Sequence, residues 1–372
     1  MDAKLILPTN WDPALLPRVA PLRPAYLYGA LPREATVRSS LVLPQATEED
    51  VAAQIAQAAQ LGIRFTYVMN ATCLGNREIS EDGRWEILQR LEWLRGVGAA
   101  AVVTANPYVM ELARKSTPDL ELQVSVLAAV NDARKAAFFR DLGADLIHID
   151  PQINRDFRRL ESIRRAVDCR LSVVVNEGCL LSCPIRQYHA NTISHSVEGI
   201  ERRYYVDYCY YRCSLARNAD VVEYLRAPWI RPQDLAEYEA VGIDLFKIAG
   251  REKMGEGASS HTPWILKVAG AYHRRRCEDV AELLVAVQPM VGLSGEAPAP
   301  WRVRIAADRL DGFLSFFRDG RCSLDCQRCS HCAEWAKACV SAEGRAAEHR
   351  KQIENDLETL RAGSYWAGTG ER

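Results

Sequence analysis

The stretch DLIHIDPQINRDFRRLESIRRAVDCRLSVVV, residues 145–175, contains the unit from which we predict the fold. Residues 145–149 and 171–175 are short apolar runs, typical of strands that are covered on both faces in a parallel sheet. Residues 156–166 lie between them and have the pattern of a capped helix with one apolar face. A strand, a helix and a second strand in this order favour a parallel sheet whose strands are joined by helices.

The same unit recurs along most of the chain. Helices are predicted to begin at Thr47, with Asp50 at the third helical position, and at Ser80. The helix after Ser80 has a predicted inner stripe of Trp85, Leu88, Leu91 and Leu94. Strands are predicted at residues 25–29, 64–69, 100–104, 122–127, 145–149, 171–175 and 245–248, with a weaker one near 229–230. This alternation predicts an α/β protein with a (β/α)8 TIM-like barrel over residues 1–290, and an open doubly wound sheet is the alternative.

A small appendage is predicted after the barrel. Residues 291–300, VGLSGEAPAP, are rich in Gly and Pro and are interpreted as a linker. Residues 301–372 then form a Cys-rich, metal-binding C-terminal appendage that ends in a helix over about residues 341–361.

Composition and charge narrow the class of protein. The 372 residues are 48% apolar and 26% charged, which is typical of a soluble globular protein. A net charge of −1 does not favour a nucleic-acid partner. We see no signal peptide and no run of about 18 apolar residues, so we expect a cytoplasmic protein without a membrane span. The 12 cysteines would then lie in a reducing compartment, where grouped cysteines more often bind metal than form disulfides.

Two pairs of cysteines share the same spacing. Cys179 and Cys183 follow the strand at 171–175, Gly178 permits a turn between them, and Pro184 suits the first position of a helix. Cys209 and Cys213 repeat the three-residue gap. Since a [4Fe–4S] cluster takes four thiolates, we predict one at the barrel mouth on Cys179 and Cys183, with Cys213 favoured as third ligand. Cys209 and Cys73 remain alternatives for the fourth ligand. In the neutral interpretation, Cys179 ends a buried strand and Cys183 is a residue of the first helical turn that binds no metal.

The appendage contains a second group, formed by Cys322, Cys326, Cys329 and Cys332. Zinc ligands usually come from two separated pairs, whereas these four lie within eleven residues, so a second [4Fe–4S] cluster is favoured over structural zinc. Some of the four could instead complete the barrel cluster. The cysteine spacing of radical S-adenosylmethionine enzymes occurs only in this appendage, so a radical enzyme is not favoured.

Polar residues at the ends of the predicted strands are candidates for chemistry, because the active sites of barrels lie there. The catalytic candidates are Glu177, Arg186 and His189, and the substrate-binding candidates are Asn70, Asn176, Lys247 and Arg251. The simpler interpretation of Glu177 is an ordinary charge at the barrel rim. For Arg186 and His189 it is a capped helix in which the histidine already has a hydrogen-bond partner. The chain lacks a dinucleotide fingerprint, a phosphate loop, HExxH and GxSxG.

Four motifs resemble the U32 (collagenase-like) peptidase family, namely NEGCLLSCPIRQYH at 176–189, APWIRPQDL at 227–235, GIDLFKIAGR at 242–251 and CSLDCQRCSHC at 322–332. The resemblance implies a TIM-like barrel with a [4Fe–4S] cluster on four cysteines. It also implies oxygen-independent hydroxylation, either of a quinone precursor or of an RNA base, although some members are described as proteases. The spacing of Cys179 and Cys183 is narrower than is usual in the family, and the Cys-rich tail is this chain's own.

We therefore predict an iron–sulfur oxidoreductase that hydroxylates, or carries out a related transfer on, an organic small molecule or biosynthetic intermediate. An external electron donor would supply electrons to this enzyme, and the tail cluster would relay them to the barrel cluster. A protein partner or carrier is also considered. The alternatives are a metal-dependent hydrolase or peptidase, an RNA-base hydroxylation factor, and a non-catalytic cluster-binding subunit.

Overall fold

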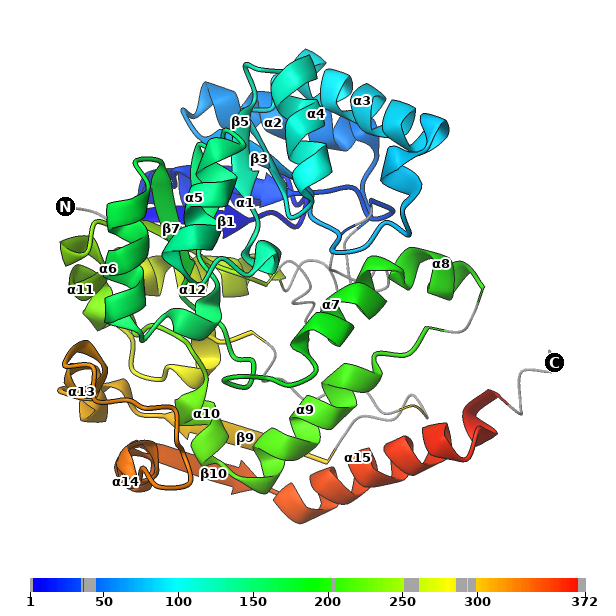
Figure 1. Cartoon of the computed structure of the whole chain (residues 1–372). Helices are drawn as coiled ribbons and strands as arrows, with labels where there is room; N and C mark the ends of the chain where they lie inside the picture. Colours follow the sequence, from blue (N-terminus) through cyan, green and yellow to red (C-terminus); the bar gives the residue numbers. More distant parts are fainter. Residues whose placement is uncertain are drawn as a thin grey trace.

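The computed structural model describes residues 3–34, 36, 45–202, 205–250, 261–285, 293 and 299–366. Eight parallel strands pair in chain order and close into a barrel, in which β8 pairs with both β7 and β1 (Figure 1). The strands are β1 (Lys4–Pro8), β2 (Tyr26–Gly29), β3 (Arg64–Met69), β4 (Ala101–Thr104), β5 (Glu121–Val124), β6 (Leu146–His148), β7 (Arg170–Val174) and β8 (Leu245–Lys247). The predicted (β/α)8 barrel is confirmed.

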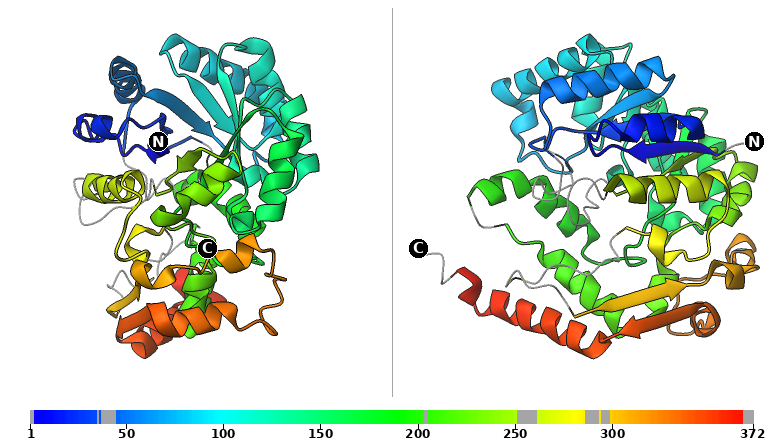
Figure 2. Two further views of the ribbon diagram at one scale, coloured as in Figure 1. Left: turned by 90° about the vertical axis from the view of Figure 1, so that its left-hand side faces the viewer. Right: turned by 180° about the vertical axis from the view of Figure 1, so that it is seen from behind.

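Helices surround the strands on the outside (Figure 2). They are α1 (Leu15–Val19), α2 (Glu48–Gln60), α3 (Glu81–Gly96), α4 (Pro107–Ser116), α5 (Ala133–Asp141), α6 (Phe157–Ala166) and α12 (His261–His273). The connection from β7 to β8 is much longer than the others. It contains α7 (Arg186–Ser194), α8 (Ser196–Glu201), α9 (Tyr208–Ala219), α10 (Val222–Arg226) and α11 (Leu235–Ala240). This excursion leaves the carboxyl end of β7, where a barrel enzyme has its active site.

The helix starts follow the predicted caps, but one buried face differs. Thr47 and Asp50 form a reciprocal capping box at the start of α2, and Asp156 caps α6. In α3, Trp85 is 60% exposed and Ile87 is buried instead. At 3.6 residues per turn, position 85 lies about 120° around the helix from Leu91, so the predicted stripe was wrong at Trp85.

Two strand predictions were also wrong. Residues 229–230 form no strand, although the Ile230 amide donates to the Val175 carbonyl (2.8 Å). The strand that the sequence prediction lacks is β1, which ends in Pro8. The pairing with β2 continues past this proline, because the Thr9 amide donates to the Tyr28 carbonyl (2.9 Å).

The boundaries of two predicted helices shift as well. α7 begins at Arg186, two residues after Pro184. The first part of the predicted helix at 341–361 is the strand β10 (Val340–Gly344), and the helix α15 is Ala346–Arg361.

The amino end of the barrel lumen is closed by a charged network. Residues in register on neighbouring parallel strands face the same side, which places Tyr26, Arg64, Glu121 and Arg170 inside. The Glu121 carboxylate accepts from the Tyr26 hydroxyl (2.7 Å), from Arg64 (3.2 Å) and from Arg170 (2.7 Å). One largely covered carboxylate thus compensates two guanidinium groups at the floor of the barrel.

We predict that Glu121→Gln lowers the free energy of unfolding by about 2 kcal/mol, since it removes charge-assisted hydrogen bonds while keeping the side-chain shape. Urea unfolding measures this effect. Glu92→Gln is the matched control, because the Glu92–Arg95 pair is exposed and should contribute less than about 0.5 kcal/mol. Equal effects in the two variants would contradict the role given to Glu121.

Above the floor, a directed chain of hydrogen bonds continues toward the mouth. Gln123 donates its amide to Glu121 (2.9 Å), so its carbonyl oxygen faces His148 Nε2 (3.2 Å), which must carry the proton. Ser172 then donates to His148 Nδ1 (2.6 Å). Burial lowers the pKa of His148 well below its usual value, and the charges of Lys247 and Arg170 lower it further. His148 is therefore neutral in the folded barrel.

This burial predicts a pH dependence of stability. The unfolded chain binds a proton at His148 more readily than the folded chain, so stability is complete above pH ~6.5 and falls below it. The expected slope from this residue is about 1.4 kcal/mol per pH unit until its folded pKa is reached. Unfolding of wild type and His148→Gln from pH 7 to 5 measures it. The variant should show the shallower decline, and parallel curves would refute the assignment.

The appendage packs beside the excursion rather than standing apart from it. β9 (Trp301–Ile305) pairs antiparallel with β10, and α13 (Ser315–Arg318) and α14 (His331–Cys339) complete a second core that includes Trp229. α15 packs along α9 through Tyr211, Ile353 and Leu357 (Figure 1). Of the predicted linker at 291–300, only residues 293, 299 and 300 are described, so the domain boundaries stay a prediction.

No helix in the described ranges combines the length and the apolarity that a membrane span requires.

Candidate metal centre at the barrel mouth

The chain turns sharply between the first two cysteines. After β7, the Glu177 carboxylate accepts from the Cys179 amide (3.1 Å), which fixes the direction of the loop. The left-handed residue is Ser182 (φ 53°), and Gly178 is not in that region, so the predicted role of Gly178 in the turn is taken by Ser182. Cys179 and Cys183 thereby lie on one loop above the carboxyl end of β7.

The second pair lies on α9. Cys209 and Cys213 are four residues apart and share a face of the helix. Asp207 caps this helix by accepting from the Tyr210 amide (3.1 Å), and the Cys213 thiol donates to the Tyr210 carbonyl (3.3 Å). A regular, capped helix therefore positions both thiols.

The four thiols act on one another electrostatically. Burial raises the pKa of Cys179 well above its usual value, and Glu177 and Cys213 raise it further. The pKa of Cys209 rises to about 12 through burial, Asp207, Cys213 and Cys183. Without a cluster the thiols of Cys179, Cys209 and Cys213 are neutral, and binding a metal would release their protons. We call Cys179, Cys183, Cys209 and Cys213 the barrel quartet.

Arg217 lies against the barrel quartet, and sequence reasoning missed it. It is 2% exposed and donates to the Gly178 carbonyl (3.0 Å) and the Ser214 hydroxyl (3.3 Å). Within the described ranges, its Nε is buried without a hydrogen-bond partner and no carboxylate pairs with it. Positions 209, 213 and 217 recur every four residues, so helical spacing could have revealed that Arg217 shares the cysteine face.

Cys73 lies apart from the barrel quartet. The neighbouring Thr72 donates to Asn191 (2.7 Å), and its amide donates to Ser194 (2.9 Å), both in the last half of α7. Cys183 precedes the other end of this nine-residue helix, about 12 Å away along the axis. The structure thus brings Cys209, rather than Cys73, to the other three.

The donor set fits a four-thiolate cluster, and the orphaned Nε of Arg217 is a donor that negatively charged sulfur would satisfy. In the described part of the chain, no three His, Cys, Asp or Glu side chains already surround one point closely enough for a single ion. The four thiols are neighbours whose side chains would close around a bound group.

Two of the predicted catalytic residues have a carboxylate partner from another segment. Arg186 forms an ion pair with the buried Asp150 (2.7 Å) and so anchors the start of α7 to the end of β6. His189 contacts Asp207 (3.0 Å), which links α7 to the cap of α9. Sequence reasoning missed both pairings, since a partner distant in sequence leaves no local signal.

The predicted substrate-binding residues differ in what they offer. Asn176 is completely buried and donates to the Ala249 and Leu283 carbonyls (3.0 and 3.1 Å), as a structural residue does. Asn70 donates to Ser125 (3.2 Å) and keeps a buried carbonyl oxygen without a partner among the described residues. Lys247 lies at the mouth end of the lumen, with its ammonium 4.5 Å from the Tyr28 ring centre. Arg251 lies outside the described residues.

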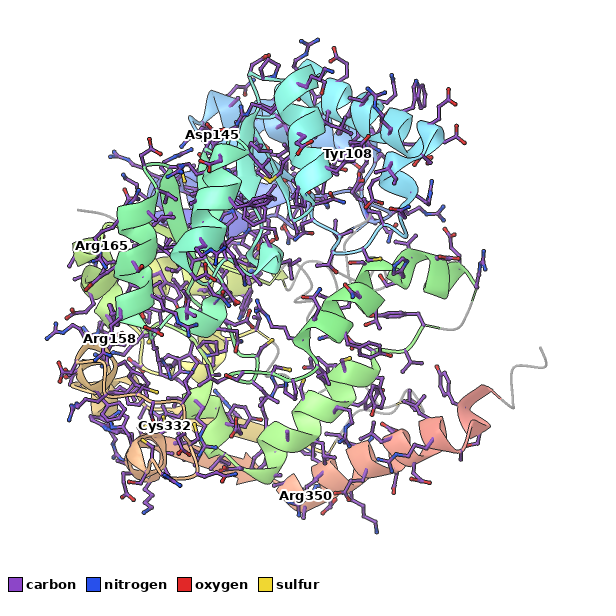
Figure 3. The ribbon with its side chains drawn as sticks, viewed as in Figure 1. Tyr108, Asp145, Arg158, Arg165, Cys332 and Arg350 are labelled. Carbon is purple, nitrogen blue, oxygen red and sulfur yellow. The ribbon has the colours of Figure 1, made fainter. Side chains whose placement is uncertain are left out.

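The tail cysteines form a second interacting set. Burial raises the pKa of Cys332, Arg155 and Arg226 lower it, and Cys322 and Cys326 raise it. Burial likewise raises the pKa of Cys326, on which Cys322 and Cys329 also act. Figure 3 shows Cys332 on α14, in the appendage. We call Cys322, Cys326, Cys329 and Cys332 the tail quartet.

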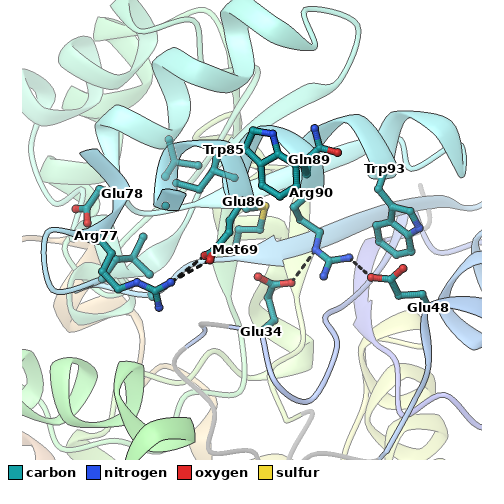
Figure 4. Close-up of a pocket in the computed structure, with 15 residues that line it drawn as sticks. Glu34, Glu48, Met69, Arg77, Glu78, Trp85, Glu86, Gln89, Arg90 and Trp93 are labelled. Carbon is teal, nitrogen blue, oxygen red and sulfur yellow. Dashed lines mark hydrogen bonds and ion pairs between the residues drawn. The ribbon is translucent and has the colours of Figure 1, made fainter. Parts of the chain in front are cut away.

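A cavity of about 540 Å³ lies elsewhere, between α3 and the end of β3 (Figure 4). Most of its charged side chains pair with one another, Arg90 with Glu34 and Glu48, and Arg77 with Glu86, whereas Glu78 accepts from the Asn106 amide (3.1 Å). None of the predicted site residues lines it, so size alone does not make it the functional site.

Comparison with known proteins gives a consistent result. Residues 38–282 match the family model described as Peptidase family U32. A protein of Methanocaldococcus jannaschii, named an uncharacterized protease, is 30% identical over 315 residues, which are 83% of this chain and 86% of that protein. A solved structure described as the U32 peptidase Mk0906 has 24% identity and a TM-score of 0.50, with 67% of this chain and 93% of the other covered. At this identity the structural likeness supports the fold alone.

Proposed function

The chain belongs to peptidase family U32, and from this premise we propose that it is an iron–sulfur oxidoreductase. The reaction would be an oxygen-independent hydroxylation, or a related transfer, on an organic small molecule or biosynthetic intermediate at the barrel mouth. The observation that supports the proposal is the barrel quartet: two cysteine pairs from separate segments lie near enough to act on one another's pKa, beside a buried guanidinium that has no carboxylate partner among the described residues.

Cys179, Cys183, Cys209 and Cys213 would hold a [4Fe–4S] cluster. When bound, the cluster would supply one-electron transfer to the site, and an external donor would keep it reduced. Replacing a C–H bond by a C–OH group removes two electrons from the substrate, so the oxygen atom would come from an organic oxygen donor that is reduced by those two electrons. Arg217 would balance the negative charge of the thiolates, because a buried cation is stable only when it is compensated.

The chain's own residues would bind and orient the substrate. The unpartnered carbonyl oxygen of Asn70 can accept a hydrogen bond from a substrate N–H or O–H group. Lys247 brings positive charge to the mouth end of the lumen, suited to an anionic substrate group. The His189–Asp207 pair provides an imidazole, held by a carboxylate, that can move a proton.

Peptidase activity is the second candidate, favoured by the names of the relatives and by the same His189–Asp207 pair. A hydrolase would use such a pair to hold an imidazole as base for a nucleophile. In the hydrogen bonds of the described residues, this imidazole contacts Asp207 and no serine or cysteine. The geometry therefore supports proton transfer better than nucleophilic attack.

The test is metal analysis and reduction of protein purified without oxygen. We expect at least about four irons and four sulfides per chain, and a paramagnetic signal after reduction with dithionite. Cys183→Ser should lose about four irons, whereas Cys169→Ser, an isolated cysteine, should lose none. Iron-free protein that cleaves fluorescent casein equally well with and without Cys183 would replace the redox proposal with the peptidase.

A further inference from the structure

We propose that the tail quartet, Cys322, Cys326, Cys329 and Cys332, binds a second [4Fe–4S] cluster. This inference goes beyond the function proposed for the barrel mouth and does not depend on it. It rests on the burial pattern of one loop, on the surroundings of Arg155 and on the start of α14.

In the loop at residues 321–330, the only residues that are partly covered are two cysteines. It contains no helix or strand, and eight of its ten residues are exposed. The two that are not exposed are Cys322 and Cys329. Its backbone hydrogen bonds are local, such as those from the Cys326 amide to Leu324 (3.0 Å) and from the Cys329 amide to Asp325 (3.0 Å). Burial of so few side chains gives an exposed polar loop too little free energy to offset the conformational entropy lost on ordering. Bonds from its cysteines to a metal cluster would hold the loop in one conformation.

The loop leads directly into a helix start that favours negative charge. α14 has nine residues, and Cys332 lies in its first turn. Ser330, its N-cap residue, makes no side-chain capping bond. The first amides of a helix lack partners within the helix and carry partial positive charge, so thiolates and sulfides close to them are stabilised.

Arg155 places a buried positive charge beside the tail quartet, and this charge has no ion-pair partner among the described residues. Its guanidinium lies 4.5 Å from the Trp229 ring and 5.0 Å from the Phe313 ring, and it donates to the Leu225 (2.8 Å) and Trp229 (3.1 Å) carbonyls. Among the described residues, no carboxylate forms an ion pair with it, and Asp234 acts on its pKa only from beyond ion-pair distance. Cys332 and Cys322 are near enough to act on the pKa of Arg155. A thiolate-bound cluster would provide the missing negative charge, as the barrel quartet would for Arg217.

The ligands are four cysteines because the nearby histidine is already used in packing. The His331 ring stacks on Phe316 at 3.9 Å and on Phe313 at 5.3 Å, and its Nε2 lies 3.4 Å from the Phe313 carbonyl. Spacings of three, two and two residues within one loop match cluster-binding runs better than the separated pairs of zinc sites. The geometry therefore points to iron–sulfur and not to a Cys3His zinc site.

The experiment measures iron, acid-labile sulfide and zinc in the full-length chain purified without oxygen. The variants are Cys326→Ser with Cys329→Ser (tail) and Cys179→Ser with Cys183→Ser (barrel). Cys277→Ser is the control, because this isolated thiol faces Gln233. We expect about eight irons in wild type and in the control, and about four in each double variant.

The wild-type count tests the proposal even if the tail variant does not fold. About four irons with one zinc would overturn it and make the tail a zinc site, and unchanged iron in a folded tail variant would also overturn it. The two proposals fail separately: iron lost only from the tail variant refutes the barrel cluster, and iron lost only from the barrel variant refutes the tail cluster.

Discussion

The Cys213→Ser variant, purified without oxygen, is expected to lose about four irons and four sulfides per chain. Cys213 is central to the barrel quartet. Cys183 acts on the pKa of Cys213, and Cys213 acts on the pKa of Cys179 and of Cys209. Loss of this ligand should therefore prevent the cluster from assembling, rather than leave a cluster held by three cysteines. We expect the rate of the proposed redox reaction to fall by at least about 100-fold, since without the cluster no group at the barrel mouth can transfer an electron.

The iron content of two further variants shows which cysteine is the fourth ligand of the barrel cluster. Cys209→Ser should behave like Cys213→Ser, because both residues lie on one face of α9. Cys73→Ser should keep its iron, because its loop packs on the far half of α7. Retention of iron in Cys209→Ser together with loss in Cys73→Ser would show that the loop after β3 moves to complete the cluster, contrary to the arrangement described above.

Much of this architecture could be predicted because it depends on local patterns. Apolar runs separated by capped amphipathic helices gave seven of the eight strands, and only β1 was missed. The two cysteine pairs were visible because they share a spacing. Their position above β7 followed from the rule that functional loops lie at the carboxyl ends of the strands.

The remaining features depend on contacts between distant segments. Asp150 and Arg186 are 36 residues apart, and nothing near either residue indicates the other. The substrate-binding prediction for Asn176 followed from its place at a strand end, whereas its burial reflects the packing of residues 249 and 283 around it. Strand position therefore identifies the mouth of the barrel but not which polar side chains are free to bind a substrate.

Arg217 allows a test in which the sign of the effect depends on the cluster. In metal-free protein the thiols of Cys179, Cys209 and Cys213 are neutral, and the partners of the buried guanidinium are a carbonyl, a hydroxyl and the Tyr210 ring, none of which carries a full negative charge. Arg217→Met should therefore stabilise the metal-free form, by about 1–3 kcal/mol, because the desolvation penalty of the charge disappears. In the cluster-bound form the same substitution removes the partner of a buried negative charge and should cost about 3–5 kcal/mol.

Two measurements separate these effects. Urea unfolding of chelator-treated protein should give a higher midpoint for Arg217→Met than for wild type. Cluster loss to a chelator should be favoured at least about 100-fold in the variant, which corresponds to about 3 kcal/mol. Arg212→Met is the matched control, because Arg212 is exposed on the same helix and should change neither quantity. If Arg217→Met destabilised both forms equally, Arg217 would be a packing residue, and its buried charge would no longer support a cluster on the barrel quartet.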